Sequence, residues 1–151
     1  MKKWGDAAVE KELSQINEME AYEPLMASDL TWQDKKDALR SLLMITEKRN
    51  GNIKARQVAD GSKQKTYDGY DKSDGSAPTV MTDSVIITGV IDAKEGRAVA
   101  VVDVNTAFLH ADNDERVLML LRGKLAEMMV RIDPSLYRKY ITYSSNGVPM
   151  L

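Results

Sequence analysis

The chain has 151 residues, with 21 Lys and Arg against 23 Asp and Glu, a formal net charge of −2 and no cysteine. This length suits one domain of about 100 to 200 residues, and the lack of cysteine excludes disulfides and thiolate zinc sites. The apolar stretches are far shorter than the roughly 20 residues of a membrane-spanning helix. Met1 is followed by Lys2 and Lys3 rather than by an apolar leader. We therefore expect an intracellular protein without a membrane segment.

The N-terminal part of the chain predicts two helices. Apolar residues recur at the helical period over residues 9–19, which indicates an amphipathic helix. Thr31 and Asp34 have the spacing of a capping box and predict a second, short helix from Trp32 to about Arg40.

A β-hairpin is expected next. Residues 41–48 are rich in apolar side chains, and residues 53–58 alternate apolar with polar ones. Asn50 and Gly51 between them form a turn pair that tolerates positive φ.

Basic residues gather on this hairpin and just after it. Residues 48 to 65 contain six basic residues and one acidic residue, Asp60, so the local net charge is 6 − 1 = +5. The basic residues are Lys48, Arg49, Lys54, Arg56, Lys63 and Lys65. Lys54 and Arg56 lie two positions apart and would project from one face of a strand. Such a face suits phosphate groups, although a solvated edge strand protected by charge has the same pattern.

The remaining elements follow in chain order: a long loop at 60–78, a helix at 82–96, strands at 98–103 and 117–121, helices at 123–132 and 134–139, and a hairpin at 140–151. Helices and strands are mixed without strict alternation. The fold class expected is therefore α+β, with a mixed or antiparallel sheet flanked by helices.

Asp103 closes the β-branched run that begins at Ala98, and an acid at the end of a buried strand needs a partner. A Mg²⁺ ion is one such partner, and a capping role at the strand end is the other. Phe108, the only Phe of the chain, is by itself typical of a core aromatic.

The longer string around Asp103 resembles a known family. Asp103-Val-Asn-Thr-Ala-Phe-Leu, followed by an acidic turn and the apolar residues 117–121, is similar to the first catalytic motif of copia-type retrotransposon reverse transcriptases. Ile53-Lys-Ala-Arg-Gln-Val-Ala-Asp-Gly61 resembles the Lys-Ala-Arg-x-Val-Ala-x-Gly fingers strand of the same family. The two motifs occur in the family order, and the resemblance spans most of the chain.

The resemblance implies a role for each matching residue. Asp103 and the carbonyl of Val104 would bind catalytic Mg²⁺, which serves nucleotidyl transfer onto a primer 3′-hydroxyl. Phe108 would be the steric gate beneath the sugar of the incoming dNTP. Lys54 and Arg56 would approach the triphosphate and the template. The partners implied are an RNA or DNA primer-template and dNTP.

The chain would then form one partial reverse-transcriptase domain, with a fingers-like part at about 1–97, a mobile loop at 60–78, and the first half of the palm at about 98–151. The sequence contains no Tyr-x-Asp-Asp string, which the family uses as its second acidic motif. We therefore expect the isolated chain to be inactive, to hold Mg²⁺ weakly or not at all, and to need the C-terminal palm, thumb and ribonuclease H part of the Pol polyprotein.

Two alternatives remain open at this point: a non-catalytic nucleic-acid-binding module, and an inert transposon relic. A partial palm would also expose a sheet edge, so self-association is expected. The resemblance places the protein in a cytoplasmic virus-like particle or in the nucleus.

Overall fold

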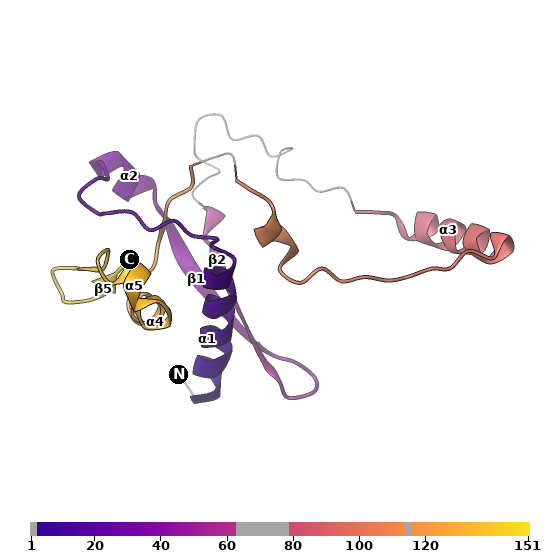
Figure 1. Ribbon diagram of the computed structural model, residues 1–151, viewed down its shortest axis with the longest axis horizontal. Coiled ribbons are helices and arrows are strands. Elements are labelled where there is room, and N and C mark those ends of the chain that lie inside the picture. Colours follow the sequence, from indigo (N-terminus) through magenta and orange to yellow (C-terminus); the bar gives the residue numbers. More distant parts are fainter. Residues whose placement is uncertain (1–2, 63–78, 114–115) are drawn as a thin grey trace.

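The computed structural model describes residues 3–62, 79–113 and 116–151 (Figure 1). Its elements are, in chain order, α1 (Lys3–Glu18), α2 (Trp32–Asp37), β1 (Leu39–Glu47), β2 (Ile53–Ala59), α3 (Thr82–Glu95), the 3₁₀ helix η2 (Ala107–His110), β3 (Met119–Leu120), α4 (Lys124–Ile132), α5 (Pro134–Tyr137), β4 (Thr142–Tyr143) and β5 (Pro149–Met150).

The main sheet has the strand order β2-β1-β3 and is mixed. β1 and β2 pair antiparallel over seven residue pairs, from Ser41 opposite Ala59 to Glu47 opposite Ile53. β3 joins β1 in parallel, with Leu39 opposite Met119. β4 and β5 form a second, antiparallel pair. Helices together with a mixed sheet confirm the expected α+β class.

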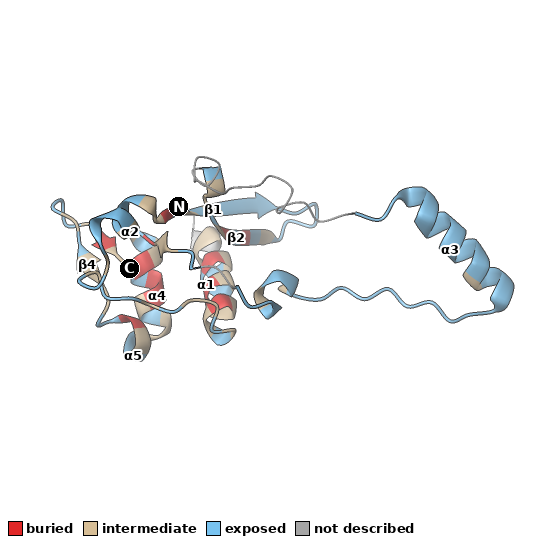
Figure 2. Cartoon of the chain, turned by 90° about the horizontal axis from the view of Figure 1, so that it is seen from above, coloured by how far each residue is buried: buried red, intermediate tan, exposed pale blue. Residues whose placement is uncertain are grey.

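The core lies where α1 meets β2 on one side and α4 on the other (Figure 2). Val9 and Leu13 of α1 are fully buried, as the helical periodicity requires. Met128 and Met129 of α4 and Ala55 of β2 belong to the same buried cluster. Both elements that flank α1 therefore hold it through apolar side chains, and this packing fixes which face of β2 turns to solvent.

Several predicted elements are confirmed: the capping box before α2, the β1–β2 hairpin, α3 up to Gly96, and the C-terminal helices and hairpin. α2 ends at Asp37 rather than near Arg40, because β1 begins at Leu39. The predicted loop at 60–78 lies largely outside the described residues.

The predicted strand at 98–103 is wrong, because this segment runs without strand pairing. Val101 and Val102 are 97% and 79% exposed. A β-branched run becomes a strand only where its backbone N–H and C=O groups can hydrogen-bond to a neighbouring segment. The described residues provide no such neighbouring strand here. The predicted strand at 117–121 shortens to Met119–Leu120 for a related reason, since β1 pairs only with those two residues.

α3 stands away from the other helices and strands (Figures 1 and 2). Its apolar side chains are exposed, among them Val85, Ile86 and Val90 at about 60% each. No helix within the described residues is long and apolar enough to cross a membrane.

Candidate nucleic-acid interface

The β1–β2 hairpin closes through local hydrogen bonds at its turn. The Lys48 N–H donates to the Asn52 carbonyl at 2.8 Å, and the Gly51 N–H donates to the Lys48 carbonyl at 2.8 Å. Gly51 has a φ of 78°, which glycine adopts without strain. The Asn50 side chain accepts the Asn52 N–H at 3.2 Å. The turn pair seen in the sequence thus sets the register of the hairpin.

The two faces of β2 differ in burial. Ala55 and Gln57 are 2% and 8% exposed and turn toward α1, whereas Lys54 and Arg56 are exposed on the opposite face. This alternation follows from the two-residue period of a strand. The packing of α1 on one face therefore directs the two cations to the solvent side.

Lys54 and Arg56 share this solvent face with residues of β1. Thr46 lies opposite Lys54, and Met44 lies opposite Arg56. Together with Lys48 these four side chains line an open hollow. Within the described part of the chain, no acidic side chain forms an ion pair with any of the three cations. The positive charge is therefore available to a bound anion, and phosphate oxygens are the natural acceptors for Arg and Lys donors.

Other basic residues of the predicted cluster extend this face only in part. Arg49 is exposed at the turn, and Lys63 and Lys65 lie outside the described residues. Met44 and Thr46 were not singled out from the sequence. Their alternate positions on the predicted strand were the available signal, because residues 44, 46 and 48 must share a face.

The residues of the motif around Asp103 occupy a separate, exposed segment. Asp103 lies in irregular backbone and is exposed, Val104 is 56% exposed, and Phe108 is 94% exposed on η2. Thr106 has a φ of 54°, and its hydroxyl contacts the Met19 sulfur at 3.0 Å. This contact ties the segment to the chain just after α1.

The solvent face of the hairpin that carries Lys48, Lys54 and Arg56 is called the basic face below. The structure does not bring Asp103 together with it. Among the described residues, no hydrogen bond or ion pair links Asp103 to Lys54 or Arg56. The described residues also contain no group of three or more His, Cys, Asp or Glu side chains that could hold a metal ion. One exposed carboxylate does not fit a pair of Mg²⁺ ions, whose mutual repulsion needs several anionic ligands.

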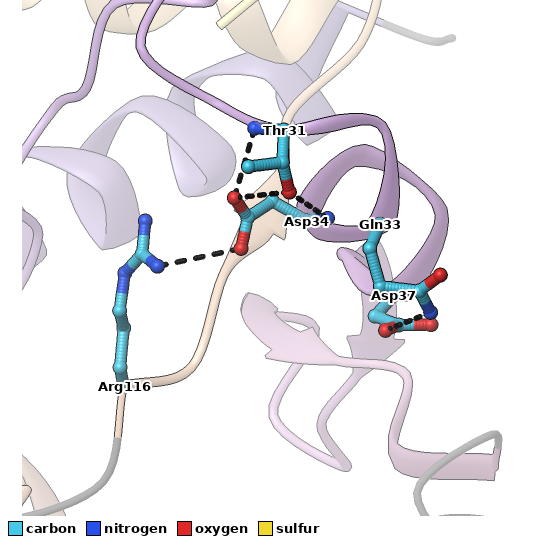
Figure 3. Close-up of polar contacts among 5 residues, drawn as sticks. All are labelled: Thr31, Gln33, Asp34, Asp37 and Arg116. Atoms are coloured by element: carbon cyan, nitrogen blue, oxygen red, sulfur yellow. Dashed lines mark hydrogen bonds and ion pairs between the residues drawn. The ribbon is translucent and has the colours of Figure 1, made fainter.

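An ion pair joins α2 to the chain downstream of the motif (Figure 3). Arg116 Nη1 lies 3.3 Å from Asp34 Oδ1. The other oxygen, Asp34 Oδ2, accepts hydrogen bonds from the Thr31 hydroxyl at 2.7 Å and from the Thr31 N–H at 2.9 Å. These hydrogen bonds, with the charge of Arg116 in addition, hold the pKa of Asp34 below its ordinary value of 3.8. The sequence indicated the capping box but not Arg116, which is 82 residues away.

A family model described as reverse transcriptase (RNA-dependent DNA polymerase) matches residues 34–137. The chain belongs to this family. The match runs from Asp34 in α2 to Tyr137 at the end of α5, so it includes both the basic hairpin and the Asp103 segment. No solved structure matches the chain. Reverse transcriptases bind a nucleic-acid template and primer, which is the class of partner that an unpaired basic face suits.

Proposed function

We propose that the chain is the fingers and first palm part of a copia-type reverse transcriptase, and that the solvent face of its β1–β2 hairpin binds nucleic acid. The observation that carries the proposal is the exposed trio of Lys48, Lys54 and Arg56 around one hollow, within the region that matches the family. The copia assignment rests on the Asp103 string and on the Lys-Ala-Arg string at residues 54–56. The fingers part would be about 1–97 and the palm part about 98–151.

The contact would be made chiefly with phosphates. Arg56 offers a planar fork to phosphate oxygens, and Lys48 and Lys54 act as point charges. The apolar part of the hollow, from Met44, would lie against a sugar or base edge. Contacts of this kind give affinity without sequence preference, and their strength falls steeply as the salt concentration rises.

Polymerisation would require a second acidic motif of the Tyr-x-Asp-Asp kind, which the sequence does not contain. Asp103 and the carbonyl of Val104 would contribute to a Mg²⁺ site, and Phe108 would contact the dNTP sugar, only after a second acidic segment assembles beside them. Because the donor set described here does not fit two Mg²⁺ ions, we propose that the chain alone binds nucleic acid without extending a primer. Primer extension above background by this chain, abolished in Asp103→Asn, would contradict that part of the proposal.

The binding proposal is tested by fluorescence anisotropy with a labelled single-stranded oligonucleotide. Lys54→Ala/Arg56→Ala should weaken binding on the order of tenfold at low salt, because two phosphate contacts are lost. Lys35→Ala/Lys94→Ala is the matched control, since it removes the same charge from exposed positions on α2 and α3. Equal weakening in both double variants would show a general charge effect and would contradict a defined site on the hairpin.

A further inference from the structure

Gln57 is the one buried polar side chain among the residues that the structure describes, and it lies directly behind the basic face. Its amide oxygen accepts a hydrogen bond from the Tyr22 hydroxyl at 3.2 Å, and its amide nitrogen donates to the Ser41 hydroxyl at 2.9 Å. Its backbone N–H donates to Glu12 Oε1 at 3.4 Å. A buried amide is costly unless its polar atoms are paired, and here both ends of the amide have partners.

The three partners come from three different parts of the fold. Glu12 belongs to α1, Tyr22 to the segment after α1, and Ser41 to β1. Gln57 thus ties β2 to each of its neighbours at one point. Burial raises the pKa of Tyr22 to about 12, so its hydroxyl remains a donor at neutral pH.

The position of Gln57 in the strand matters for the cations. Arg56 precedes it and Lys54 lies three residues before it, both on the opposite face. Because successive residues of a strand point to opposite faces, restraining Gln57 also restrains the direction in which Arg56 leaves the sheet. We propose that Gln57 is a positioning residue for the basic face, holding Arg56 and Lys54 so that both reach one phosphate chain. This inference rests on the proposed function.

The test compares the salt dependence of oligonucleotide binding, which reports the number of phosphates neutralised. Lys54→Ala/Arg56→Ala should reduce the slope of log K against log salt by about 1.4, the value for two phosphates on a single strand. Gln57→Leu keeps all the cations and should still reduce the slope by about 0.7, the value for one lost contact on a single strand. Tyr22→Phe removes one partner of the amide and should change the slope in the same direction by a smaller amount.

A variant in the core distinguishes the proposed positioning role of Gln57 from a general contribution to stability. Met128→Ala on α4, where Met128 is 2% exposed, removes core packing at a residue that makes none of the Gln57 hydrogen bonds. It should lower stability and leave the slope of the folded protein unchanged. A wild-type slope in Gln57→Leu and Tyr22→Phe would overturn the positioning role. An unchanged slope in Lys54→Ala/Arg56→Ala would instead overturn the proposed function itself.

Discussion

Thr31 and Asp34 exchange hydrogen bonds across the first turn of α2: the Asp34 N–H donates to Thr31 Oγ1 at 3.1 Å, and the Thr31 N–H donates to Asp34 Oδ2 at 2.9 Å. Each side chain therefore satisfies a backbone donor that a helix start leaves without an intrahelical partner. The same aspartate reaches Arg116, so the helix start also anchors the chain that leads into β3.

Thr31→Ala should lower the free energy of unfolding by about 1 kcal/mol, the usual cost of losing a Thr cap. Thr31→Ser keeps the oxygen atom that accepts the Asp34 N–H and should remain close to the wild type. Urea denaturation followed by circular dichroism measures both variants. Equal stability of Thr31→Ala and Thr31→Ser would contradict a capping role for the hydroxyl.

The core and α3 should respond very differently to truncation of an apolar side chain. Leu13 is fully buried between β2 and α4, so Leu13→Ala should cost about 2 to 5 kcal/mol of unfolding free energy. Ile86 on α3 is 59% exposed, and Ile86→Ala should change stability by no more than about 0.5 kcal/mol. The comparison uses urea denaturation of the two variants. A large loss in Ile86→Ala would mean that α3 packs against the rest of the chain in solution.

The free energy of unfolding should depend on Tyr22 at alkaline pH. Its pKa is about 12 in the folded chain, against an ordinary 10.0, because burial disfavours the phenolate and the charge of Glu12 adds to that effect. The corresponding stability is fully present below pH 10 and is lost as the pH rises through 12. Tyr22→Phe should therefore lose less stability than the wild type between about pH 10 and about pH 12.

Tyr143→Phe is the control for that experiment, because Tyr143 is 65% exposed on β4. Its unfolding free energy should follow the wild-type pH profile. If Tyr22→Phe and the wild type lost stability in parallel on the alkaline side, the burial of the Tyr22 hydroxyl would be contradicted.

The lowered pKa of Asp133 predicts that the free energy of unfolding falls in acid. The Ser135 hydroxyl donates to Asp133 Oδ1 at 2.6 Å and the Leu136 N–H donates at 2.9 Å, and these bonds hold the pKa of Asp133 below 3.8. The stability that they confer is present above pH 3.8 and is lost as the pH falls through the lower folded-state pKa. Asp133→Asn and Ser135→Ala should both flatten the acid limb of a plot of unfolding free energy against pH, and an unchanged acid limb would contradict this role.

The elements that local signals determine were predictable from the sequence. The Asn50-Gly51 turn and the alternation at residues 53–58 specify the hairpin, and the spacing of Thr31 and Asp34 specifies the helix start. From the alternation, Lys54 and Arg56 were expected on one face, and both are exposed there. Each of these features depends on residues only a few positions apart.

The features that escaped prediction depend on distant partners. The run at 98–103 has the composition of a strand, but the described residues give its backbone no strand to pair with. The hydrogen bonds of Gln57 join residues that are 45, 35 and 16 positions away in sequence. Periodicity and turn pairs in a sequence do not indicate contacts between residues so far apart.

Locating the bound nucleic acid would show whether the β1–β2 hairpin is its binding site. A single-stranded oligonucleotide with photoreactive thymines would be cross-linked to the protein at low salt, and the modified peptides would be identified by mass spectrometry. Binding at the hairpin predicts cross-links within residues 44–56, where Met44, Lys54 and Arg56 line the hollow, and their loss in Lys54→Ala/Arg56→Ala. Cross-links confined to α3 or to the β4–β5 hairpin, with residues 44–56 unmodified, would contradict it.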